Sequence, residues 1–116
     1  MSDVPFPILD WRIDQQWQAK SFFNYVCEQR KLVTVLEAIS RRHSYAYNEE
    51  ECVFPDLDDP DPYFHFVGVK FGVSGEEVDV TEGEFWYYIE RAALFWMERN
   101  DADTDAIRRI LRRIPD

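Results

Sequence analysis

Apolar residues recur at helical spacing in stretches near both ends of the chain. One stretch covers residues 16–28, and a second covers residues 32–39 and is followed by the basic pair 41–42, which suits the C-terminus of a helix. A last helix is predicted to begin near Thr104, which can cap it. Its buried face is formed by Ile107, Ile110, Leu111 and Ile114.

The sharpest boundary in the sequence is a capping box made by Thr81 and Glu84. In this motif each side chain satisfies a free backbone donor at the start of a helix, so a helix is predicted to begin at Glu82. The apolar residues that follow cover more than one helix face, and we expect this helix to be largely buried. They are Phe85, Trp86, Tyr88, Ile89, Ala92, Ala93, Phe95, Trp96 and Met97.

Between the helical stretches the apolar pattern changes to a period of two. Residues 63–73 alternate with apolar side chains on both faces, which predicts a central strand. After a turn at Ser74 and Gly75, residues 76–80 form the second arm of a hairpin, with Glu77 and Asp79 pointing outward together. Residues 43–62 lack periodicity and are rich in proline and aspartate, which indicates a surface loop.

These elements predict one α+β domain spanning residues 1–116, with helices packed on a small antiparallel β-sheet. No apolar run approaches the roughly twenty residues that span a bilayer, and the N-terminus lacks the basic start and apolar core of a signal peptide. We therefore expect a cytoplasmic protein without a membrane partner.

The negative charge of the chain is concentrated in its middle. The net charge is −10, and residues 49–84 contain twelve acidic residues against one base, Lys70, while the remainder carries eleven acids and twelve bases. A surface of one sign repels itself and is usually retained for solubility or for a partner of opposite sign. The expected partner is therefore a basic protein rather than nucleic acid, whose phosphates require Lys and Arg. The arginines of residues 108–113 are interpreted as a solvated helix face.

The aspartate-rich segment of residues 54–63 is the main candidate for metal chemistry. Starting the calcium-loop pattern of the EF-hand at Asp56 puts Pro60 at position five and Asp61 where glycine is required, so the pattern fails. The glycines are too scattered for a phosphate loop, and no nucleophile motif surrounds the histidines or cysteines. We expect no catalytic residue, no metal and no cofactor.

Four short motifs carry a resemblance to a known family. They are C-V-F-P-D at 52–56, G-V-K-F at 68–71, E-E-V-D-V at 76–80 and T-E-G-E-F at 81–85. Over about residues 20–113 the chain resembles the immunity proteins of bacterial contact-dependent growth inhibition systems that protect against ribonuclease toxins. The resemblance implies a non-catalytic protein that binds the C-terminal toxin domain delivered by a neighbouring cell and blocks its nuclease site.

A ribonuclease needs a cationic groove to hold RNA, so an inhibitor can offer carboxylates in place of phosphates. The prolines restrict the aspartate loop and the hairpin fixes its two outward acids, so these groups lose little entropy on binding. Tyrosines flanking the loop are candidate anchors. The predicted partner-binding residues are Asp56, Asp58, Asp59, Asp61, Glu77, Asp79, Tyr45, Tyr47 and Tyr63.

Two other functions remain open from the sequence. A small acidic adaptor of a basic host protein would have the same charge map as a toxin inhibitor. A metal-dependent enzyme using the aspartate loop would instead lose turnover on substitution of Asp58 or Asp59 by alanine.

Overall fold

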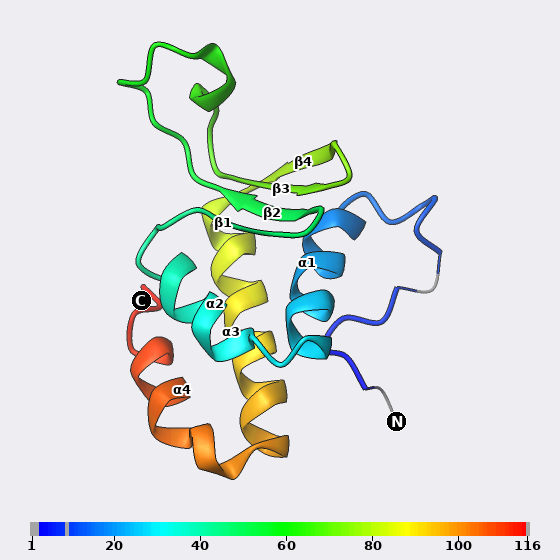
Figure 1. Ribbon diagram of the computed structural model, residues 1–116, viewed down its shortest axis with the longest axis vertical. Coiled ribbons are helices and arrows are strands. Elements are labelled where there is room, and N and C mark those ends of the chain that lie inside the picture. Colours follow the sequence, from blue (N-terminus) through cyan, green and yellow to red (C-terminus); the bar gives the residue numbers. More distant parts are fainter. Residues whose placement is uncertain (1–2, 9, 116) are drawn as a thin grey trace.

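A four-stranded antiparallel sheet lies across one end of a group of helices (Figure 1). The computed structural model describes residues 3–8 and 10–115. Residues 1–2, 9 and 116 of the predicted domain lie outside the described residues. The strands are adjacent in chain order: β1 (Tyr45–Tyr47), β2 (Glu50–Val53), β3 (Val69–Val73) and β4 (Glu76–Val80). The helices are α1 (Trp17–Glu28), α2 (Leu32–Ile39), α3 (Glu82–Arg99) and α4 (Thr104–Leu111). The predicted α+β class is confirmed.

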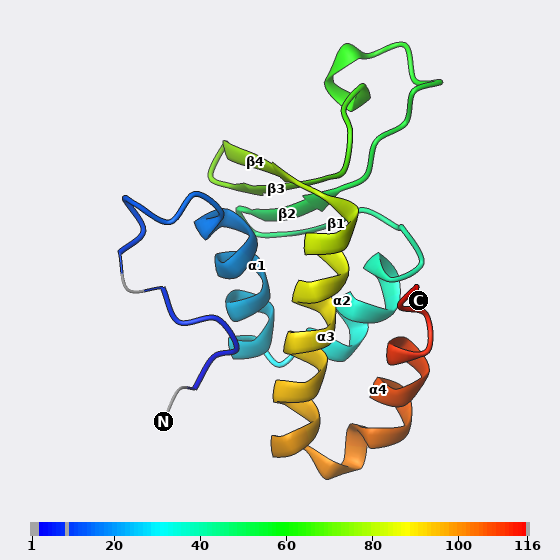
Figure 2. The same cartoon turned by 180° about the vertical axis from the view of Figure 1, so that it is seen from behind.

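All four helices lie on one side of the sheet, and the other face of the sheet is free of them (Figure 1). On this side α3 lies between α1 and the pair α2 and α4 (Figure 2). Cys52 pairs with Phe71, and Phe71 pairs with Val78, so all three point toward the helices. The ring of Phe71 packs against Phe22 and Phe23 of α1, with centroids 5.3 and 5.5 Å apart. The core therefore lies between the sheet and the helices.

The predicted start of α3 is confirmed in its atomic detail. The Glu84 backbone amide donates to Thr81 Oγ1 at 3.1 Å, and the Thr81 amide donates to Glu84 Oε1 at 2.9 Å. The last helix also begins at the predicted Thr104, but the residue at its N-cap position is Asp103. The Asp103 side chain accepts a hydrogen bond from Trp96 Nε1 at 2.7 Å instead of capping the helix. This bond joins the start of α4 to α3.

The predicted loop of residues 43–62 is partly wrong, because it contains β1 and β2. Cys52 is fully buried through its pairing with Phe71, a contact nineteen positions away that local periodicity does not reveal. The predicted strand of residues 63–73 is reduced to β3, because Pro62–Phe64 forms a short 3-10 turn and Gly68 has φ +89°. A Cβ at Gly68 would lie 2.0 Å from the Val80 carbonyl oxygen, so only glycine fits there. Within the described residues, no helix is both long and apolar enough to cross a membrane.

Candidate functional site

Residues 54–68, here called the acidic loop, project from the sheet on the side away from the helices (Figure 1). The loop joins the two central strands, β2 and β3, and carries four aspartates. Asp56, Asp58 and Asp61 are exposed and Asp59 is half-buried. Four negative charges are therefore held on a structure that stands clear of the main body.

The aspartates also order the acidic loop by accepting hydrogen bonds from its backbone. The Asp58 amide donates to Asp56 Oδ1 at 3.0 Å, and the Asp61 amide donates to Asp59 Oδ1 at 2.8 Å. The Tyr63 amide donates to Asp61 Oδ1 at 2.9 Å. Each bond uses one carboxylate oxygen and fixes the position of its charge. A binding partner meets a preformed arrangement, so less conformational entropy is lost on binding.

The second part of the site is the outer face, the side of the sheet that points away from the helices. By strand register this face carries Ala46, Glu51, Val53, Lys70, Gly72, Glu77 and Asp79. Lys70 Nζ lies 3.7 Å from Asp79 Oδ1 and 4.0 Å from Glu77 Oε1, and its side chain is 14% exposed. Glu77 and Asp79 thus share one ammonium, and Glu51 adds a third acid to the same face, which leaves the outer face with a net negative charge.

Tyr63 connects the acidic loop to the outer face. Its hydroxyl donates to Glu77 Oε2 at 2.6 Å and lies 3.4 Å from Glu51 Oε1. Its ring centroid is 4.8 Å from Lys70 Nζ, and the ring of Phe66 lies 4.5 Å from the same atom. Partial burial of the phenol, reinforced by its bond to Glu77, raises the pKa of Tyr63 above its ordinary value. The phenol stays neutral and holds the loop against the sheet as a donor.

Seven of the nine predicted partner-binding residues are brought into one region. These are Asp56, Asp58, Asp59, Asp61, Tyr63, Glu77 and Asp79. Tyr45 and Tyr47 lie on the opposite, helix-facing side of β1. Tyr45 packs against the core, while the Tyr47 ring packs on Tyr25 at 5.8 Å with Lys31 Nζ 5.1 Å from its centroid. The structure places Tyr47 apart from the other seven residues, whereas Tyr45 lines a small hollow together with Tyr63 and Glu51.

Glu51, Phe66 and Lys70 belong to this region although the sequence did not identify them as site residues. Glu51 belongs to a run of three glutamates in the sequence, and only its place on a strand shows that it shares a face with Glu77. In the sequence, Gly72 could have indicated the place of Glu51, because the two residues pair across the sheet. A Cβ at Gly72 would lie 2.9 Å from Glu51 Oε1, so the glycine makes room for the Glu51 side chain.

The chemistry available to this region is electrostatic. Among the described residues, no group of three or more His, Cys, Asp or Glu side chains is placed to hold a metal ion. Both cysteines are free and buried, and burial raises the pKa of Cys27 to about 12 and that of Cys52 well above its ordinary value. Their thiols are therefore protonated and unreactive at neutral pH. The groups that this region presents at its surface are carboxylates in fixed positions.

The sequence of the chain was also compared with those of known proteins. The sequence matches the family described as CDI immunity protein over residues 15–111. This range runs from just before α1 to the last residue of α4, so it includes every strand and the whole acidic loop. No curated protein matches the chain.

Proposed function

The chain belongs to the CDI immunity protein family, that is, the immunity proteins of contact-dependent growth inhibition, and on this premise we propose how it neutralises its toxin. Members of such a family bind a cognate toxin and are generally non-catalytic. In our proposal the toxin domain is a ribonuclease that acts in the cytosol of the protected cell. The acidic loop and the outer face cover the cationic groove in which this domain would hold RNA, and the protein itself binds no nucleic acid.

The observation that carries this proposal is the fixed arrangement of carboxylates on two adjoining structures. Backbone hydrogen bonds hold the aspartates of the acidic loop, and strand register holds Glu51, Glu77 and Asp79 on the outer face. Carboxylates in preset positions can occupy the sites of RNA phosphates, and the positive field that attracts RNA also attracts them. Such steering raises association from about 10⁵–10⁶ toward about 10⁸ M⁻¹s⁻¹ at low salt. Fast capture matters because a free ribonuclease degrades RNA until it is bound.

A long-lived complex with the toxin requires contacts other than ion pairs, because each exposed ion pair contributes little to the free energy of binding. The acidic loop supplies exposed apolar side chains beside its aspartates: Leu57 is 74% exposed and Val67 is 91% exposed. Tyr63 is 38% exposed and adds an aromatic surface next to the carboxylates. We assign these three side chains to the centre of the interface, with the acidic groups around them.

The test is a titration of the purified protein into the toxin domain encoded next to it, with cleavage of RNA followed in the same mixture. Cleavage should stop at one equivalent of protein, and association should slow as salt is raised. Full cleavage at saturating protein would overturn the proposal. Binding to the toxin without any loss of cleavage would instead support an adaptor, and metal-dependent turnover by the protein alone would support an enzyme.

A further inference from the structure

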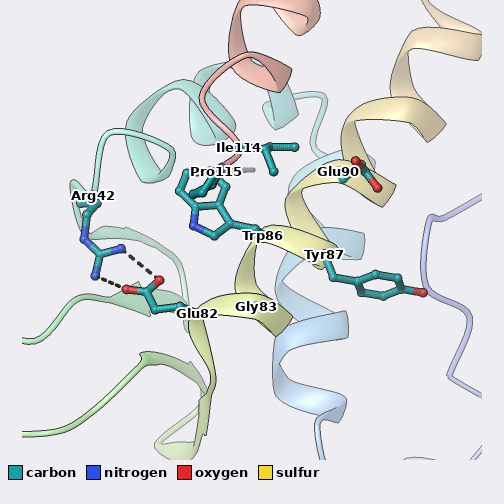
Figure 3. A pocket seen from close by; sticks show the side chains of 8 residues that line it. All are labelled: Arg42, Glu82, Gly83, Trp86, Tyr87, Glu90, Ile114 and Pro115. Atoms are coloured by element: carbon teal, nitrogen blue, oxygen red, sulfur yellow. Dashed lines mark hydrogen bonds and ion pairs between the residues drawn. The ribbon is translucent and has the colours of Figure 1, made fainter.

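A second surface feature, a groove beside the first turns of α3, is not used by the acidic site. It has a volume of about 720 Å³ and is lined mainly by α3 and by the chain segment that follows α4 (Figure 3). Trp86 faces Ile114 and Pro115 across the groove and gives it an apolar lining. Trp86 is half-buried and packs edge-on against Phe85, with ring centroids 5.0 Å apart, so its position is fixed by the core.

The groove is joined to the base of the acidic loop through Arg42. The guanidinium of Arg42 lies 4.8 Å from the ring centroid of Phe54, the first residue of the acidic loop. The same guanidinium bonds both carboxylate oxygens of Glu82 at the rim of the groove, at 2.8 and 3.1 Å (Figure 3). The base of the acidic loop therefore adjoins the groove, and a partner that extends from the loop past Phe54 reaches the groove.

The charge at the groove favours a basic neighbour. Arg42 and Glu82 neutralise each other through their paired contacts. Glu90 also lines the groove, is exposed, and makes no ion pair within the described part of the chain (Figure 3). The uncompensated charge of the groove is therefore negative, like that of the acidic loop.

We infer that this groove receives an apolar side chain of the toxin domain that has an Arg or Lys beside it. This inference rests on the proposed function, because its occupant is the partner that the acidic loop captures. The apolar side chain packs between Trp86 and Ile114, and the neighbouring cation pairs with Glu90. The charges of the acidic loop then set the rate of capture, and the groove, together with the apolar side chains of the loop, sets how long the complex lasts, since buried apolar contacts act mainly on dissociation.

The experiment measures association and dissociation of the toxin domain for two groove variants, Trp86→Ala and Glu90→Arg. Both should raise the dissociation rate about tenfold or more, with a much smaller change in association. Glu90→Arg alters an exposed side chain, so it tests the groove even if loss of the Trp86 ring weakens the fold. Matched controls are Ile13→Ala, at an apolar residue that is 78% exposed, and Glu98→Arg, at an exposed acid farther along α3. The controls should dissociate at the wild-type rate.

The outcomes separate this inference from the proposed function. If the wild type captures the toxin domain and stops cleavage but both groove variants dissociate at the wild-type rate, the groove inference is wrong and the proposed function stands. If the wild type does not bind the toxin domain, both fall together. If the free protein sediments as a dimer that Glu90→Arg converts to a monomer, a second copy of the chain occupies the groove and the inference is overturned.

Discussion

Neutralising the acidic loop without disturbing its backbone gives the sharpest test of electrostatic capture. Asparagine has the same shape as aspartate and keeps an oxygen that can accept the backbone bonds now made by Asp59 and Asp61. The triple variant Asp58→Asn, Asp59→Asn, Asp61→Asn therefore removes three charges and leaves the loop fold in place. Reversal to lysine would remove those acceptors as well and would mix a change of charge with a change of loop structure.

The expected effect follows from the exposure of these side chains. Two unit charges about 7 Å apart in water interact by about 0.6 kcal/mol, and a Debye length of about 8 Å reduces this to about 0.25 kcal/mol at physiological salt. Three loop charges that each face one or two cations of the toxin then contribute about 1 kcal/mol to the encounter, or about a fivefold change in association rate. At about 0.01 M salt the screening nearly vanishes, and the effect should exceed about tenfold.

The assay is stopped-flow association with the toxin domain at low and physiological salt. The matched control neutralises three exposed acids at the helix ends farthest from the acidic loop: Glu28→Gln, Glu98→Gln and Asp101→Asn. The molecule is 43 Å along its longest axis, which is several Debye lengths at physiological salt, so the control should associate at nearly the wild-type rate. Equal slowing by both triple variants would mean that the association rate depends on net charge alone. An unchanged rate in the loop variant would show that the acidic loop is not part of the interface.

Three further predictions concern the scaffold, and each is checked by denaturation in urea. Gly68→Ala should destabilise the fold by about 3 kcal/mol or more, because its Cβ would lie 2.0 Å from the Val80 carbonyl oxygen. The control Gly75→Ala has φ +87° and no atom within 4 Å, so it should cost only about 1 kcal/mol. Equal losses of stability in the two variants would contradict this steric explanation. Thr81→Ala removes the cap of α3 and should cost about 1 kcal/mol, and a loss near zero would mean that water replaces the cap. Burial raises the pKa of Glu50 above 4.5, so the folded state favours the protonated acid. The protonated acid therefore contributes stability below pH 4.5, and this contribution is lost as the pH rises through the raised pKa. The free energy of unfolding of Glu50→Gln should thus increase relative to that of the wild type between about pH 4 and about pH 7, and an equal difference at both pH values would contradict this sign.

The helices were predictable because their boundaries depend on neighbouring residues. The capping box at Thr81 and Glu84 places the start of α3 within four residues of sequence. The strands β1 and β2 were missed because Cys52 becomes a core residue only when β3 pairs with it. The alternation of residues 63–73 continues through Gly68, but the left-handed backbone there ends the strand, and a pattern of side chains does not show a dihedral angle.

On the outer face, too, some features follow from neighbouring residues in the sequence and others from residues far apart in the chain. Glu77 and Asp79 were expected to point outward together, and the tight turn at Ser74 and Gly75, with φ of 50° and 87°, fixes the register that places them so. The contact of Tyr63 with Glu77 depends on the path by which the acidic loop returns to the sheet, which no local signal records.

In the proposed function the acidic loop and outer face take the place of RNA on the toxin domain. The most direct measurement adds the protein to a catalytically inactive toxin domain that already holds a labelled RNA. We expect the RNA to be released as one equivalent of protein binds, and the variant with three neutralised loop aspartates to need a higher concentration to release it. A stable complex that contains toxin domain, RNA and this protein together would contradict the claim.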